Sequence, residues 1–156
     1  VQTCALPISM TDKREQILVR LLTISKSIDG IIAAFRNKDE ISDKQRPCIL
    51  ILDADEAAND GDPMNRSGRS PRRVGMTPEI YILLGAKPED IGTQINILRA
   101  SLVSAILTDE QLASIVGANG DVRYEGCATS LARGRTMEGE MGVSFTFSYV
   151  LRPDDL

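Results

Sequence analysis

Apolar side chains recur at helical spacing in two long segments of the chain. Between residues 11 and 28 they are separated by four, three and four positions, which predicts an amphipathic helix. A second stripe follows Pro88, a residue typical of a first helical turn. Thr108-Asp-Glu-Gln111 matches a capping box and predicts a short third helix that ends at Val116. The two stripes consist of Ile17, Leu21, Ile24 and Ile28, and of Ile91, Ile95, Leu98, Leu102 and Ile106.

Strand periodicity is clearest from Val143 to Leu151, where apolar and polar residues alternate. The run from Cys48 to Leu52 is apolar throughout, which predicts a central strand covered on both faces, or one with an oligomer contact on its second face. Pro78 withholds one backbone donor from its strand, so we expect an edge or a bulge there. Weaker strand patterns cover residues 31–36, 74–84 and 122–129.

These elements occur in the order helix, three strands, two helices, two strands. Helices and strands in runs predict an α+β domain, in which two long helices and one short helix pack on one sheet of about five strands. In the strand at 122–129 we expect Val122, Tyr124, Gly126 and Ala128 to share one face.

The first nine residues, VQTCALPIS, resemble a translated sequencing-library adapter, because Val1 to Ile8 follow its reading frame in order. We therefore expect residues 1–9 to be an artefact without a structural role. Subtracting nine from 156 residues leaves 147, which suffice for one domain. That single domain is expected to span residues 10–156.

Composition excludes several classes of protein. The absence of histidine excludes Ser-His-Asp and Cys-His catalytic sites and His-ligated metal sites. Cys48 and Cys127 are too few for a four-cysteine zinc site, and we expect both to lie in the sheet as small apolar side chains. A net charge of −4, with three Phe and three Tyr, argues against a nucleic-acid partner. No apolar run approaches the ~20 residues of a membrane span.

Residues 53–73 and 130–140 lack periodicity, and we expect both to be long polar loops. The first begins with acids and ends with arginines, a segregation that suits head-to-tail contact with a second copy; a solvated loop and a phosphate contact are the alternatives. The acids are Asp53, Asp55, Glu56, Asp60 and Asp62, and the arginines are Arg66, Arg69, Arg72 and Arg73.

The apolar strand that ends in Asp53-Ala-Asp55 resembles the first motif of haloacid-dehalogenase-type phosphatases. There the first aspartate is the nucleophile, the second is the acid–base group, and magnesium binds nearby. Ala57 replaces the family's Thr or Val, however, and a Gly/Pro/Asp segment follows where the family has a helix. Ala57 also breaks the EF-hand ligand spacing. We therefore expect these acids to solvate a strand end, with no catalytic residue, no metal site and no cofactor.

Three stretches together resemble the tail terminator proteins of long-tailed phages and prophages, also called minor tail proteins of the lambda U type. They are RPCILILDADE, MTPEIYILLG and GANGDVRYEGCATSLARGRTMEGEMGVSFTFSYVL, and the last is the most specific. The similarity covers nearly all of Met10 to Leu151. It implies a mixed β-sheet with helices packed on it, in agreement with the fold class above.

The resemblance implies a structural role and no enzymatic activity. Terminators form a homohexameric ring on the end of the tail tube, stop polymerisation of the major tail protein, and present a surface to the head–tail connector. The expected location is the virion tail, and the host cytoplasm during assembly. Another phage neck or head-closure protein is the nearest alternative, and a metal-dependent phosphatase that uses Asp53 and Asp55 is the more distant one.

A closed ring needs two different surfaces on each copy, because its contacts run head to tail. In a chain of net negative charge, clustered arginines are suited to contact the acidic surface of a neighbour. We expect the assembly interface to include Arg66, Arg69, Arg72, Arg73, Arg133 and Arg135. No specific nucleic acid and no membrane is expected as a partner.

Overall fold

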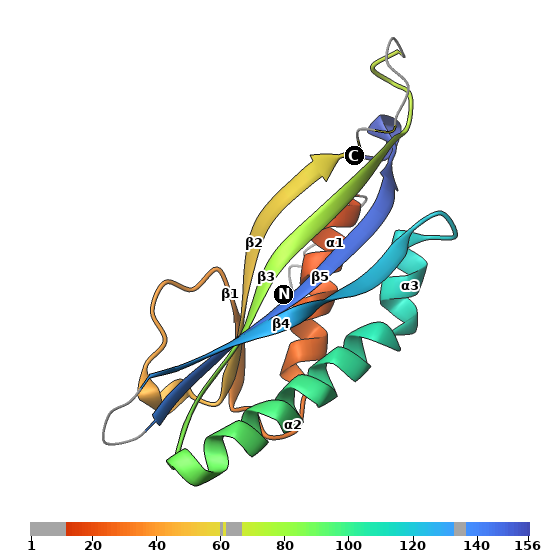
Figure 1. The fold of residues 1–156 in the computed structure, drawn as a ribbon. Coiled ribbons are helices and arrows are strands. Elements are labelled where there is room, and N and C mark those ends of the chain that lie inside the picture. The colour runs from red at the N-terminus through yellow and green to blue at the C-terminus, as the bar shows by residue number, and fades with distance from the viewer. Residues whose placement is uncertain (1–11, 60, 62–66, 133–136) are drawn as a thin grey trace, which may run out of the picture.

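The computed structural model describes residues 12–59, 61, 67–132 and 137–156. Within them the chain forms one sheet of five strands and three helices, two long and one short, which confirms the predicted α+β class (Figure 1). The elements are α1 (Lys13–Lys26), β1 (Ala33–Arg36), β2 (Cys48–Ala58), β3 (Arg72–Ala86), α2 (Pro88–Leu107), α3 (Glu110–Val116), β4 (Asp121–Ala132) and β5 (Met137–Leu151). Short 3-10 turns lie at Asp43–Gln45 and Pro153–Asp155.

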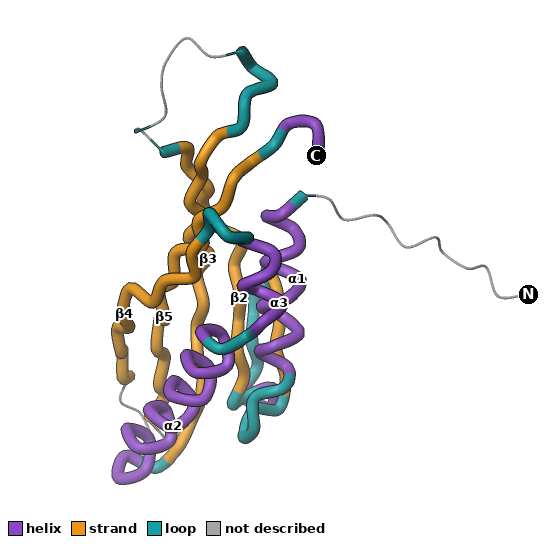
Figure 2. The backbone as a smooth tube through the Cα atoms, turned by 90° about the vertical axis from the view of Figure 1, so that its right-hand side faces the viewer, coloured by secondary structure: helices purple, strands orange, loops and turns teal. Residues whose placement is uncertain are grey.

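The strands follow the order β1-β2-β3-β5-β4. The sheet is mixed, because β1 pairs with β2 in parallel and all other pairs are antiparallel. All three helices lie on one face of the sheet, as the view along its edge shows (Figure 2). The opposite face therefore has no helix over it within the described residues.

The core lies between that helical layer and the sheet. The two apolar stripes predicted for α1 and α2 are buried as expected, and they meet the alternate residues of β3 and β5. Phe145 and Phe147 on β5 are the largest fully buried side chains, with their rings 6.0 Å apart. Burial of one apolar face along several strands is what fixes their register.

Side-chain caps position the helices. Asp12 caps α1 and accepts from the Arg14 N–H at 3.1 Å. Asp109, and not the predicted Thr108, caps α3 and accepts from the Leu112 N–H at 2.9 Å. Two further bonds of 3.0 and 2.6 Å from Arg20 on α1 reach the same carboxylate, hold its pKa below the usual range, and tie α1 to α3.

No single described helix is long and apolar enough to span a membrane; α2 and α3 meet that criterion only as a pair bent by 51°. The apolar stripe of α2 faces the sheet and is buried there.

The prediction of a loop over residues 53–73 was wrong at both ends. Strand β2 continues to Ala58, and β3 already begins at Arg72, so the connection covers only residues 59–71. The ladder between them persists because strand pairing uses backbone groups, and Ala58 still pairs with Val74 where the side chains are polar or small. A bulge between Leu52 and Asp55, with Ala54 at φ +50°, absorbs the change of register.

Pro78 lies in a central strand and not at an edge, since β3 pairs with both β2 and β5. The register between β3 and β5 is unchanged across Pro78, with Met76 opposite Phe147 and Glu79 opposite Ser144. The expected bulge lies on the other neighbour, β2, between Leu52 and Asp55, which pair with Glu79 and Thr77 on either side of Pro78. The missing N–H of Pro78 falls in this interval, where the ladder has no regular pair to lose.

The predicted loop over residues 130–140 was also wrong. Strands β4 and β5 extend to Ala132 and from Met137, and they form a hairpin. A bulge between Tyr124 and Gly126 reverses the alternation of β4, so Cys127, opposite Val143, lies on the helix-facing side. Gly126 and Ala128 therefore do not share a face with Val122. Cys127 is exposed because β4 is the outermost strand, whereas Cys48 is buried as expected.

Candidate assembly interface

The first aspartate of the Asp53-Ala-Asp55 motif forms an ion pair that links strands and helix α1. Arg36 on β1 binds the Asp53 carboxylate through Nε and Nη2, each at 2.8 Å, and binds Glu15 on α1 at 2.8 and 2.9 Å. The Arg36 guanidinium is the main cause that holds the pKa of Asp53 below its ordinary value. Burial partly opposes this shift, and the Asn37 side chain adds to it. Asp53 is therefore held as an ionised partner of an arginine.

Asp53 and Asp55 are not brought together. Asp53 reaches α1 through Arg36, on the helix-facing side, whereas Asp55 pairs with Thr77, whose side chain is exposed on the opposite face. The bulge at Ala54 separates the two carboxylates. Over the described ranges, no three His, Cys, Asp or Glu side chains gather into a group that could hold a metal ion. Asp60 and Asp62 lie outside these ranges.

The arginines expected at an interface fall into two groups. Arg66, Arg133 and Arg135 lie outside the described residues. Arg69, Arg72 and Arg73 lie at the end of the sheet where β3 begins and β5 ends, and these strands project beyond the helical layer there (Figure 2). We refer to Arg69, Arg72, Arg152 and the Pro153–Asp155 turn as the arginine end.

Arg69 is a highly accessible arginine of this end. Its guanidinium contacts the Asp154 carboxylate at 3.1 Å, and the two side chains are 81% and 67% exposed. An ion pair that open is worth about 0–1 kcal/mol, so a stronger partner can replace it at small cost. The arginine end is held together by contacts that are easily exchanged.

Arg72 and Arg73 are strand residues and not loop residues. Arg72 pairs with Leu151 and is half-buried, whereas Arg73 pairs with Val150 and is exposed. Both already make contacts within the chain. The sequence pattern missed their strand assignment because charged residues break the apolar alternation on which it relies.

The second surface is the sheet face opposite the helices, which we call the open face. Its residues on β3 and β5 are small or polar, in contrast to the apolar residues that alternate with them. Gly75, Thr77, Glu79 and Tyr81 come from β3, and Gly142, Ser144, Thr146 and Ser148 come from β5. The face of β3 that points away from the helices is thus polar, and this polar face extends across β5.

The open face is closed at one end. Cys48 and Leu83 oppose each other there and are both buried. Burial raises the pKa of the Cys48 thiol, and Arg46 and Lys38 from the β1–β2 connection lie close enough to oppose that rise. The apolar run of β2 was predicted to be covered on both faces. On the open face this holds for Cys48, whereas Leu50 and Leu52 are only partly buried.

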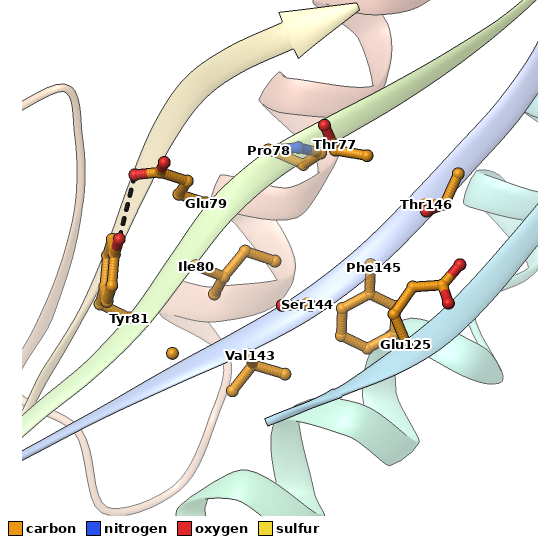
Figure 3. A pocket seen from close by; sticks show the side chains of 11 residues that line it. Thr77, Pro78, Glu79, Ile80, Tyr81, Glu125, Val143, Ser144, Phe145 and Thr146 are labelled. Atoms are coloured by element: carbon orange, nitrogen blue, oxygen red, sulfur yellow. Dashed lines mark hydrogen bonds between the residues drawn. The ribbon is translucent and has the colours of Figure 1, made fainter. Parts of the chain in front are cut away.

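Two hollows line the rest of the open face. One, of about 250 Å³, has Glu79 and Tyr81 on one side and Glu125 on the other, with Ser144 between them (Figure 3). The other, of about 390 Å³, lies toward Arg73 and Asp121, and the two adjoin at Thr77 and Thr146. Together they form a groove with a floor of small side chains.

The polar groups around the first hollow are partly paired. The Tyr81 hydroxyl donates to Glu79 Oε2 at 3.0 Å, and burial together with the Glu79 carboxylate raises the pKa of Tyr81. Glu125 accepts from Arg123 Nε at 2.6 Å. The sequence analysis had not selected Glu79, Tyr81 or Glu125 as site residues, although strand parity places the first two on one face.

No protein-family model matches the chain, and no curated protein is significantly similar to it.

Proposed function

We propose that the protein is a structural component of a phage tail, a terminator that forms a ring on the end of the tail tube, stops polymerisation of the major tail protein and offers the joining surface for the head connector. The proposal rests on the sequence resemblance. One observation of the fold supports it: the two surfaces without a helical covering, the arginine end and the open face, are different from each other and lie on different parts of the molecule.

That arrangement suits a ring. A head-to-tail contact repeated around an axis uses two unlike patches on every copy and closes without leaving either patch exposed. Each ion pair contributes little free energy in an isolated chain, but the contributions add up when every copy in a ring repeats the contact. A terminator with such contacts associates only weakly in solution and completes its ring on the tube.

The ion-paired state of Asp53 supports a structural role for the acids of β2. A nucleophilic aspartate needs an open approach to its carboxylate, whereas both oxygens of Asp53 are bound by Arg36. We therefore propose no phosphatase activity. Magnesium-dependent turnover of p-nitrophenyl phosphate that is lost in Asp53→Asn would overturn the structural proposal.

The decisive experiment is negative-stain electron microscopy of tail tubes polymerised from the major tail protein of the same phage, with and without this chain. A terminator caps tube ends and shortens the length distribution. Tubes that grow unchanged, with the chain bound instead to the isolated connector, would favour a head-closure protein. A chain that binds neither would contradict the proposal.

A further inference from the structure

We propose that the open face is the receptor for the arginine end of a second copy of this chain, with Arg69 of one copy seated in the hollow between Glu79, Tyr81 and Glu125 of the next. This inference rests on the proposed ring and identifies the two surfaces that meet in it. It concerns contacts between copies and leaves the contact with the tube unassigned.

The chemistry of the hollow matches a guanidinium. Arginine is recognised by carboxylates that accept its N–H groups and by aromatic rings on which its plane stacks. Glu79 and Glu125 flank the hollow on opposite sides, and the Tyr81 ring lies beside Glu79 (Figure 3). The Tyr81 hydroxyl is already bonded to Glu79, which leaves the ring itself as the contact surface.

The floor of the groove permits close approach. At Gly142 a Cβ atom would come within 3.6 Å of the Tyr81 ring, so the glycine leaves the space beside that ring open. Ser144 and Thr146 continue the floor with short side chains. A projecting segment can therefore reach the level of the carboxylates without displacing a bulky side chain.

Charge selects the occupant. Around the hollow the open face carries Glu79 and Glu125, of which Glu125 is already paired with Arg123, and the Glu140 carboxylate lies near enough to Tyr81 to raise its pKa further. The chain has a net charge of −4, yet its arginine end holds three arginines against two aspartates. This arginine-rich end projects beyond the helices, so it can enter a hollow of a second copy.

The pairing requires only an exchange of partners. Arg69 leaves an exposed contact with Asp154 and gains the Glu79 carboxylate and the Tyr81 ring, and it shares Glu125 with Arg123. Tyrosine and arginine are the residue types that most often dominate interfaces, and both are present here. Arg73 does not take part in this exchange, because it lines the second hollow of its own copy, at the end of the groove.

The test uses charge reversal and sedimentation equilibrium of the isolated chain at low salt. Wild type should self-associate with rising concentration, and Arg69→Glu or Glu79→Arg should each weaken that association about tenfold, the effect of ~1.4 kcal/mol. Glu89→Arg makes the same charge change as Glu79→Arg but at the exposed start of α2, and it should leave association unchanged. High salt should weaken wild type in the same direction as the two reversals.

Complementation makes the assignment specific. An equimolar mixture of Arg69→Glu and Glu79→Arg should regain part of the lost association, and so should the double variant R69E/E79R. A wild type that stays monomeric at every concentration, or reversals that behave like Glu89→Arg, would overturn the inference.

The inference and the proposed function can fail separately. Self-association that follows this pattern in a chain that caps no tubes would uphold the pairing and reject the terminator role. Tube capping that survives both reversals would uphold the role and reject the pairing. Tube binding that is lost in Glu79→Arg while self-association persists would assign the open face to the tube protein and overturn the inference.

Discussion

Arg36 and Asp53 form a two-pronged ion pair between neighbouring parallel strands, with both bonds at 2.8 Å. Their side chains are 22% and 30% exposed, so the pair is largely shielded from water. The Asp53→Asn variant should lower the free energy of unfolding by about 1.5–2 kcal/mol, the lower part of the range for hydrogen bonds to charged groups. Urea denaturation measures it. Asp55→Asn, at an exposed site two residues away, is the control and should stay within about 0.5 kcal/mol of wild type.

The same arginine gives stability a dependence on acid pH. Arg36 is the largest cause that lowers the pKa of both Asp53 and Glu15 below their unfolded values. A carboxylate with a lowered folded pKa contributes stability above its unfolded pKa, about 3.9 for Asp and 4.3 for Glu, and loses it as the pH falls through the folded value. Unfolding free energy should therefore decrease below about pH 4.

In Arg36→Met this acid dependence should be shallower, because the two pKa values return toward their unfolded ones. Arg123→Met removes an arginine whose pair with Glu125 is much more exposed, and its profile should follow wild type. Equal slopes in Arg36→Met and wild type would contradict the prediction.

Removal of residues 1–9 should not change the melting temperature. These residues lie outside the described part of the chain, and the cap of α1 comes from Asp12. A further deletion that includes Asp12 should cost about 1 kcal/mol through the loss of that cap. Differential scanning calorimetry of both truncations compares them. A drop of several degrees on the first deletion would show that the segment belongs to the fold.

Gly120 should be intolerant of any side chain. A Cβ atom there would lie 2.2 Å from the Val116 carbonyl oxygen and 2.6 Å from that of Ser148, so α3 and β5 would have to move apart. Gly120→Ala should cost about 1–3 kcal/mol, as overpacking does. Gly68→Ala, where a Cβ meets nothing within 4 Å, is the matched control and should be neutral in thermal unfolding. Equal melting temperatures would contradict the close approach.

The sequence predicted what depends on burial. The stripes of α1 and α2 and the alternation of β5 were predicted correctly, because each buries one face against the others. The predicted strand ends and strand faces were wrong where the sequence has no apolar alternation. The ends of β2 and β3 are held by backbone pairing, and a bulge at Glu125 inverted the faces of β4. The pairing of Arg36 with Asp53 joins residues 17 positions apart, which no local spacing encodes.

The corrected strand ends predict a sharp boundary in hydrogen exchange. The β2–β3 ladder continues to Ala58 and Val74, and the Asn59 N–H still donates to the Arg73 carbonyl at 2.8 Å. Beyond it, residues 67–69 of the described turn are exposed, and the backbone N–H groups of the turn make local bonds: Ser70 N–H donates to the Ser67 carbonyl at 2.9 Å, and Arg69 N–H donates to Ser67 Oγ at 3.2 Å. Exchange follows local opening, which is rare in a paired strand and frequent in an exposed turn.

Mass-spectrometric hydrogen exchange on dilute monomer should therefore show slow exchange up to Asn59, fast exchange at residues 67–70, and slow exchange again from Arg72. Residues 145–151 of β5, paired with β3 and mostly buried on one face, supply the slow reference. Fast exchange at Ala57 and Ala58 would mean that the loop begins where the sequence alone had placed it, near Asp53. Strong protection at residues 67–70 in the monomer would show that the arginine end is ordered before a second copy binds it.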